Sequence, residues 1–105
     1  MPVVKKKNGE REPYDRNKIR KGLLISCQKR PVSAETIDQM IDKIEKELQS
    51  YEKKEVETSF IGDIVMNVLK EVDKVAFIRF ASVYKEFVDP EDFIAKVKEV
   101  REENK

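Results

Sequence analysis

The spacing of apolar residues predicts a chain that is mostly helical. The clearest helical period follows Ser33, a predicted N-cap, where apolar side chains return every three or four positions and leave a charged outer face. Two similar stripes follow other predicted N-caps, Asp15 in one case and Thr58 or Ser59 in the other. The stripes expected to face a core are Ile19, Leu23, Leu24 and Cys27; Ile37, Met40, Ile41, Ile44 and Leu48; and Ile61, Ile64, Val65, Val68, Leu69 and Val72.

The first fifteen residues predict a β-hairpin ahead of these helices. Val3 and Val4 begin a β-prone stretch, Asn8-Gly9 is a type I′ turn signal, and residues 12–14 can return as the second strand. Because Pro13 cannot donate a hydrogen bond to a ladder, that strand should be short or at an edge. Residues 55–57 could add a third strand to the hairpin.

A helix starting at Asp73 differs from the others, because residues 75–87 are apolar around most of its circumference. Such a helix is either central in the domain or shared with another subunit. A last helix is predicted at Asp89-Pro90, and residues 94–105 are expected to form its end and a frayed tail. The candidates for an interface between subunits are Phe80, Val83, Tyr84 and Phe87.

Composition then limits the chemistry. A length of 105 residues is that of about one domain, and 41% of them are charged. One Cys and no His exclude a disulfide framework, a Cys/His metal site and His-dependent nucleophilic catalysis within this chain. The carboxylates lie mostly on predicted solvent faces, so we expect no enzyme, and Cys27 is expected to be a buried structural residue. With no apolar run long enough to span a membrane, we expect a soluble, cytoplasmic domain.

The charge is unevenly distributed. Residues 1–30 hold ten Lys and Arg against three Asp and Glu, while residues 31–105 hold twelve against eighteen. Such a short basic region favours a compact anion over a long nucleic-acid track, although a solvated basic face without a ligand explains the pattern equally well. The cations of this region are Lys5, Lys6, Lys7, Arg11, Arg16, Lys18, Arg20, Lys21, Lys29 and Arg30.

Several of these cations converge near the predicted start of the first helix, where free backbone amides and ammonium groups together can hold a polyphosphate. Glu12 lies among them. It is either a surface salt-bridge partner of little energetic value or an acceptor for an exocyclic amine such as that of adenine. The residue pattern alone favours the salt bridge.

Residues 4–19 resemble the opening of an ATP-cone, the regulatory nucleotide-binding domain of many ribonucleotide reductases. Together with residues 29–33, 61–66 and 75–87, they resemble more closely the ATP-cone of the NrdR family, the bacterial transcriptional repressors of ribonucleotide reductase genes. The resemblance covers residues 3–93, and three blocks in the same order make it specific.

This resemblance implies an α+β fold in which a short hairpin or three-stranded sheet covers a bundle of four to five helices. It also implies binding of ATP or dATP, with Mg²⁺, under the sheet. Val4 would line the base pocket, Lys6 and Lys7 would meet phosphates, Glu12 and Asp15 would contact the adenine edge, and Lys18 and Thr58 would complete the site. Gly62 stands where some reductase cones carry a phosphate-contacting His.

Full-length members of the family carry an N-terminal zinc ribbon with two Cys-x-x-Cys pairs, and no such pairs are present in this sequence. We therefore expect an excised domain or a free-standing cone, with zinc and DNA bound only through a ribbon absent from this chain. The net charge of +1 agrees with weak DNA binding by this chain alone.

The function expected from the resemblance is that of a regulatory domain of such a repressor. Nucleotide binding would change its self-association, and the oligomeric state would control operator binding. Two alternatives are an allosteric cone of a ribonucleotide reductase and a helical interaction module without a ligand.

Overall fold

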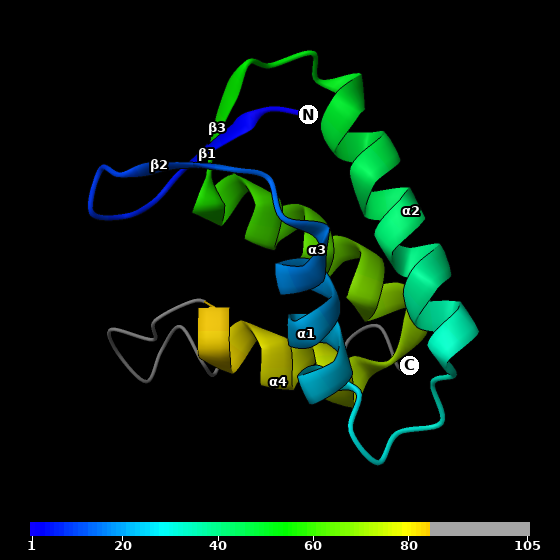
Figure 1. The fold of residues 1–105 in the computed structure, drawn as a ribbon. Helices are drawn as coiled ribbons and strands as arrows, with labels where there is room; N and C mark the ends of the chain where they lie inside the picture. Colours follow the sequence, from blue (N-terminus) through cyan, green and yellow to red (C-terminus); the bar gives the residue numbers. More distant parts are fainter. Residues whose placement is uncertain (85–105) are drawn as a thin grey trace.

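The computed structural model describes residues 1–84, so the helix predicted at Asp89 and the tail of residues 94–105 lie outside the described residues. Within residues 1–84, two strands, two helices, a third strand and two further helices follow one another as an α+β fold (Figure 1). They are β1 (Val3–Lys5), β2 (Arg11–Pro13), α1 (Arg16–Ser26), α2 (Ala34–Ser50), β3 (Glu55–Glu57), α3 (Thr58–Val72) and α4 (Lys74–Tyr84).

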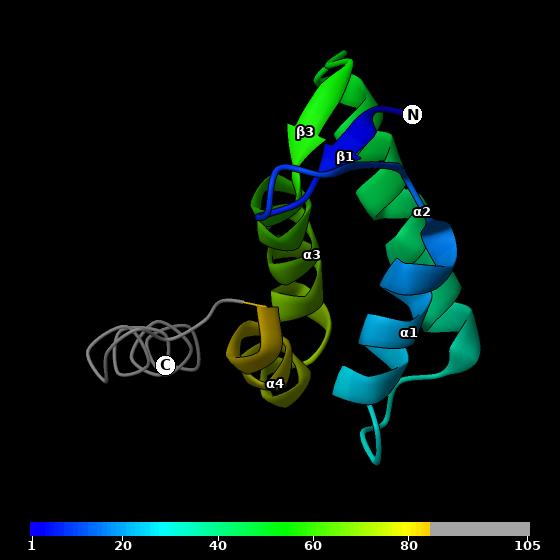
Figure 2. The ribbon, with the colours of Figure 1, turned by 60° about the vertical axis from the view of Figure 1, so that its left-hand side comes forward.

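The three strands form one small mixed sheet in the order β2-β1-β3. Strand β1 is central, antiparallel to β2 and parallel to β3, and Val4 lies opposite both Glu12 and Val56. The predicted third strand is confirmed, and Pro13 lies on an edge strand as its missing donor requires. The sheet lies above α3 and beside the upper end of α2 (Figure 2).

The four helices pack as a ring below the sheet. Helix α1 contacts α2 and α4, and α3 contacts the same two helices from the other side (Figure 2). The ring encloses the core, to which the sheet contributes Val4 and Val56. No helix within residues 1–84 is long and apolar enough to cross a membrane.

The hairpin turn is not the predicted type I′ turn. That type needs positive φ at both central residues, but only Gly9, at φ 90°, has it, and Asn8 is not among the described non-glycine residues with positive φ. The Gly9 amide donates to the Lys6 carbonyl at 2.9 Å, and the Lys6 amide donates to the Glu10 carbonyl at 2.7 Å. Gly9 therefore closes a three-residue loop in which only one position needs a left-handed conformation.

Two of the three predicted helix caps are confirmed. Asp15 accepts a hydrogen bond from the Asn17 amide at 2.9 Å, and Ser33 accepts one from the Thr36 amide at 3.0 Å. The third is wrong, because α3 begins at Thr58 directly after β3 and the N-cap is Glu57. The backbone passes from strand to helix without a loop, which leaves no room for a cap at Thr58 or Ser59.

The core contains most of the predicted apolar positions. Leu24 and Val72 are exceptions, with 49% and 39% of their surface exposed, because each lies at the edge of its helical stripe and turns to solvent. Met66 is buried although the apolar stripe did not include it. The core consists of Val4, Leu23, Cys27, Ile37, Met40, Ile41, Ile44, Leu48, Val56, Ile61, Ile64, Val65, Met66, Val68, Leu69, Ala76, Phe77, Phe80 and Ala81.

Candidate functional site

The underside of the sheet, the face turned to the helices, brings two predicted site residues together. Val4 and Glu12 are register partners on neighbouring strands, so their side chains project from the same face. Val4 is 6% exposed and packs in the core, which fixes this face as the underside. Lys6 follows Val4 by two positions and shares its direction by strand alternation. The hairpin thus presents an apolar side chain, a carboxylate and an ammonium group on one face.

The carboxylate of Glu12 contacts two ammonium groups. The Lys18 Nζ lies 2.9 Å from each Glu12 carboxylate oxygen, and the Lys6 Nζ lies 3.4 Å from Oε2. Lys18 is in the first turn of α1, so the contact links the hairpin to that helix. The hydrogen bond from Lys18 outweighs the effect of desolvation and holds the pKa of Glu12 below its ordinary value. The group is therefore a charged carboxylate between two cations at neutral pH.

The start of α3 adjoins the end of β1. The Thr58 hydroxyl donates to the Lys5 carbonyl at 3.2 Å, which places the first residue of α3 beside the strand that leads into Lys6 and Lys7. Glu57, the N-cap of this helix, makes no side-chain hydrogen bond to its first-turn amides. A helix N-terminus with amide donors beside two lysines offers charge and directed hydrogen bonds for an anion.

Gly62 lies one turn further along α3. A Cβ built at this position would meet no atom within 4 Å among residues 1–84. Within residues 1–84, no atom therefore lies next to the Cβ that a larger residue at this position would carry.

Asp15 lies between β2 and α1 and is the N-cap of that helix. One of its carboxylate oxygens is engaged as the cap of α1, so the residue already holds a structural role there. Its neighbours anchor the same corner to α2: the Tyr14 hydroxyl donates to Glu45 at 2.8 Å, and Arg16 pairs with Glu45 and with Asp42, the latter at 2.9 Å. This network fixes the start of α1, and hence the position of Lys18.

The sequence did not reveal that network. Tyr14 and Glu45 are 31 positions apart, and no periodicity within one element indicates a contact between two elements. The only signal was the acidic face of α2 opposite the basic face of α1, which predicts attraction between the helices without naming pairs.

The predicted site residues thus form one group with a few members at its border. Val4, Lys6, Glu12 and Lys18 meet at the underside of the hairpin. Thr58 lies next to β1 through its hydrogen bond to Lys5. The remaining two, Lys7 in the turn and Asp15 at the helix cap, are both exposed.

The candidate interface residues do not share one environment. Phe80 is 2% exposed and belongs to the core of the single chain, whereas Val83 is 71% exposed. The helix is apolar on nearly all sides in sequence, but the packing buries one side of it, with Ala76 and Phe77 inward and Val75 at 39% exposure. The Tyr84 side chain and Phe87 lie outside the described residues.

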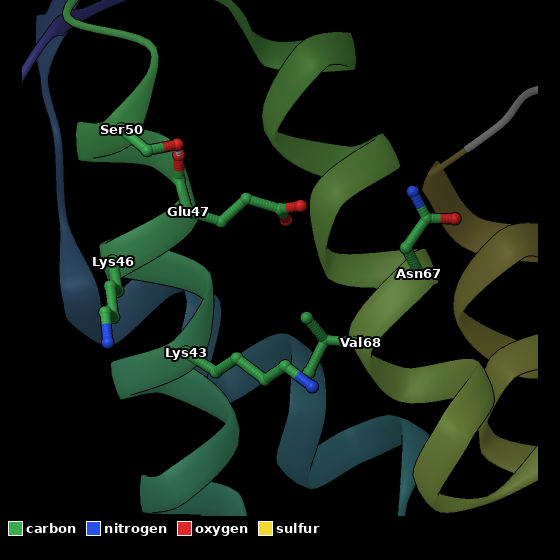
Figure 3. A pocket seen from close by; sticks show the side chains of 6 residues that line it. All are labelled: Lys43, Lys46, Glu47, Ser50, Asn67 and Val68. Atoms are coloured by element: carbon green, nitrogen blue, oxygen red, sulfur yellow. Dashed lines mark hydrogen bonds between the residues drawn. The ribbon is translucent and has the colours of Figure 1, made fainter.

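A groove of about 370 Å³ lies elsewhere, between α2 and α3. Lys43 and Glu47 extend from α2 toward α3, and Val68 lies opposite them (Figure 3). Its lining carries both signs of charge and includes none of the predicted site residues in the described part of the chain. The lining residues are Lys43, Lys46, Glu47, Ser50, Asn67 and Val68.

Comparison with protein families supports the resemblance seen in the sequence. The model of the ATP cone domain matches residues 2–90, which is most of the chain. The sheet-and-helix arrangement described above is the α+β fold expected for that domain.

Comparison with individual proteins gives one recurring name, transcriptional repressor NrdR. The protein of that name from Syntrophus aciditrophicus is 48% identical over 97% of this chain, and the one from Agathobacter rectalis is 49% identical over 93%. The Listeria welshimeri protein is 45% identical over 98% of the chain. The chain spans 64% and 65% of the length of the first two and 67% of the third. The chain therefore belongs to the ATP cone domain family, in the group that these NrdR repressors represent.

Proposed function

We propose that this chain is the adenine-nucleotide-sensing domain of a cytoplasmic transcriptional repressor of ribonucleotide reductase genes. It acts as a regulator and performs no catalysis. Its ligand is ATP or dATP with Mg²⁺, bound at the underside of the hairpin. Zinc and DNA are bound by a ribbon domain in the part of the repressor that this chain does not cover. The similarity to proteins named as repressors favours this function over that of a reductase cone.

The observation that carries the proposal is the position of Glu12 among Val4, Lys6 and Lys18. The carboxylate can accept a hydrogen bond from the exocyclic amine of adenine, and Val4, which packs in the core on the same face, would line the base pocket. The two ammonium groups lie on the same side as the carboxylate. An adenine base and an anionic phosphate chain therefore find complementary groups within one small face of the hairpin.

The phosphates would extend toward the turn and the start of α3. Lys6 and Lys7 lead into the turn, and the first-turn amides of α3 lie beside Lys5 through the Thr58 contact. Ammonium groups supply charge and helix amides supply direction, so together they suit a triphosphate better than a monophosphate. Mg²⁺ would accompany the phosphates as their counter-ion.

The regulatory step is a change in self-association. A bound nucleotide bridges the hairpin and the helices, and it favours whichever assembly presents that arrangement. The exposed side of α4, which includes Val83, is the proposed contact between subunits. The resulting assemblies would differ in how they present their attached ribbon domains to an operator.

Titration calorimetry with ATP, GTP and AMP tests the binding proposal. Lys6→Gln and Lys7→Gln should each lower ATP affinity about tenfold, because a charge-assisted contact is lost. The loss should be larger for ATP than for AMP and should shrink as salt rises. Glu12→Gln should weaken the preference for ATP over GTP, because guanine carries an oxo group where adenine has its amine.

Lys54→Gln is the matched control. It removes one exposed lysine directly before β3, at the end of the sheet away from the hairpin turn. The change should leave ATP affinity unchanged. Absence of ATP binding by the unaltered chain would refute the proposed function. Equal affinities in the unaltered chain and in the Lys6, Lys7 and Glu12 variants would refute the proposed site.

A further inference from the structure

Two lysines of the proposed nucleotide site, Lys6 and Lys18, already contact a carboxylate. Both oxygens of Glu12 lie 2.9 Å from the Lys18 ammonium group, and Oε2 lies 3.4 Å from that of Lys6. Glu12 thus takes the position of an anionic ligand toward these two cations. It does so from within the chain, six positions before Lys18.

The contact of Glu12 with the two lysines should affect the binding of a bare polyphosphate differently from that of an adenine nucleotide. A phosphate chain that approaches Lys6 and Lys18 must displace the Glu12 carboxylate from them and then remain near its negative charge. A bare polyphosphate offers the displaced carboxylate no new partner. A nucleotide carrying adenine offers an amine that donates a hydrogen bond, so the carboxylate exchanges one partner for another.

From this contact we infer that Glu12 is a specificity-determining residue that excludes phosphate-rich anions lacking an adenine base. It holds Lys6 and Lys18 until an amino group of the base replaces them. The inference rests on the proposed nucleotide-binding function and adds a second role to Glu12. Besides accepting a hydrogen bond from the base, the residue makes base recognition a condition for strong phosphate binding.

The energetics allow the exchange. Side-chain exposure is 57% for Lys18, 41% for Lys6 and 27% for Glu12, so water reaches all three groups. Ion pairs of this kind are weak, because solvent screens them and two long side chains must be held in place. Glu12 is charged at neutral pH, and the hydrogen bond from Lys18 lowers its pKa below the ordinary value of 4.5. The contact can therefore open for the correct ligand while it still opposes an incoming anion.

The test compares inorganic tripolyphosphate with ATP by titration calorimetry on the whole chain. Glu12→Gln should raise tripolyphosphate affinity on the order of three- to tenfold, because it releases two weak ion pairs and removes one repulsive charge. ATP affinity should not rise in parallel, since the same change removes the acceptor for the adenine amine. The ratio of the two affinities is the quantity that reports the role.

Two further variants isolate the cause. Glu55→Gln removes a carboxylate from the same sheet, where it pairs with Arg11, and should leave the ratio unchanged. Combining Glu12→Gln with Lys18→Gln should reduce the gain in tripolyphosphate affinity, because one of the two released cations is then missing. Circular dichroism of each variant confirms that the fold is retained.

The outcomes separate the two proposals. If the unaltered chain binds ATP but Glu12→Gln leaves tripolyphosphate affinity unchanged or lower, the exclusion role is refuted and the nucleotide site stands. An equal gain in Glu55→Gln would also refute it, because the effect would then be one of net charge. Failure of the unaltered chain to bind ATP refutes both.

Discussion

Arg30 and Asp73 are 43 positions apart in the chain, and the Arg30 Nε lies 3.1 and 3.0 Å from the two carboxylate oxygens of Asp73. Asp73 also accepts a hydrogen bond from the Ala76 amide at 2.9 Å and so caps the start of α4. Arg79 of that helix donates to the carbonyls of Ser26 and Gln28. The end of α1 and the loop after it are therefore attached to the α3–α4 junction through Asp73 and to the middle of α4 through Arg79.

Replacement of Asp73 should destabilise the fold. Asp73→Ala removes the cap of α4 and leaves Arg30 without its partner, so we expect a loss of about 2 kcal/mol in the free energy of unfolding, measured with urea. Asp73→Asn should cost less, because an amide can still cap the helix. Glu71→Ala, at an exposed position in the last turn of α3, should change the free energy of unfolding by less than about 0.5 kcal/mol.

The contribution of Asp73 should depend on pH. Burial raises the pKa of Asp73, but the hydrogen bonds from Ala76 and Arg30 outweigh burial and hold it below its ordinary value of 3.8. A carboxyl whose pKa is lower in the folded state stabilises the fold above its unfolded pKa, and that stabilisation is lost as pH falls. The difference between the unaltered chain and Asp73→Asn should therefore be full at neutral pH and shrink below pH 3.8. A difference independent of pH would contradict the assignment.

Tyr14 should ionise at unusually high pH. Burial, together with the hydrogen bond to Glu45, raises its pKa well above the ordinary value of 10.0. The stabilisation that this contact provides should be present below pH 10.0 and disappear as pH rises through the folded-state pKa. The absorbance of tyrosinate during an alkaline titration checks this expectation, because Tyr14→Phe should lack a late step that Tyr51→Phe retains. If both variants keep the late step, Tyr14 is not its source.

The same substitution has a measurable cost at neutral pH. Tyr14→Phe removes the hydroxyl that donates to Glu45 at 2.8 Å, while Glu45 keeps its pairing with Arg16. The expected loss in the free energy of unfolding is about 1 kcal/mol. Because the network also fixes the start of α1, a small decrease in ATP affinity should accompany it.

Val83→Glu should test the proposed subunit contact without disturbing the fold. Val83 is 71% exposed, so the change should alter the free energy of unfolding by less than about 0.5 kcal/mol. If the exposed side of α4 joins subunits, light scattering should show a lower mass than that of the unaltered chain when ATP or dATP is present. Ile25→Glu, at another exposed apolar position with 58% exposure, should leave the mass unchanged.

Phe80→Glu provides the contrasting case. This residue is 2% exposed, so a buried charge should unfold the chain rather than only separate subunits. A strictly monomeric unaltered chain, with and without nucleotide, would remove the support for regulation by self-association.

Cys27 should react slowly with thiol reagents in the folded chain. It is 5% exposed, and burial raises the pKa of its thiol. Since the thiolate is the reactive form, both its access and its fraction are reduced. The rate of modification should increase strongly in denaturing urea. Native and unfolded rates that agree would show that the thiol is accessible in the fold.

Local signals in the sequence predicted local structure well. Asp15 and Ser33 act as caps through contacts two and three residues away, and Gly9 provides a left-handed turn position. These features depend on neighbours in the sequence, so their residue types are informative by themselves. The period of α2 is equally informative, because one stripe of that helix faces the core.

Features that join distant segments were harder to predict. Leu23 and Leu24 are adjacent and equally apolar, yet the first is completely buried and the second is 49% exposed. A periodic pattern locates a stripe but not its width, which depends on how closely neighbouring helices approach. The predicted N-cap of α3 was wrong for a similar reason, since only the pairing of β3 with β1 shows that the helix begins at Thr58.

In the candidate site, too, the residue types could be predicted from the sequence but the contacts between elements could not. The cations and Glu12 were identified by type and spacing, but the contact of Glu12 with Lys18 depends on how the hairpin lies on α1. Likewise, the residue pattern alone treated salt bridge and amine acceptor as alternatives for Glu12. The contacts with Lys6 and Lys18 confirm the salt bridge, and the acceptor role is a proposal.

The central strand has a consequence for synthesis of the protein. The Val3 amide donates to the Lys54 carbonyl at 2.9 Å, and β1 pairs along its whole length with residues 55–57. During translation, the hairpin leaves the ribosome before β3, which follows only after α1 and α2 have been made. A nascent chain that ends before residue 54 therefore carries an unpaired strand edge and no start of α3 beside Lys5. The proposed nucleotide site is therefore complete only after the start of α3 has emerged.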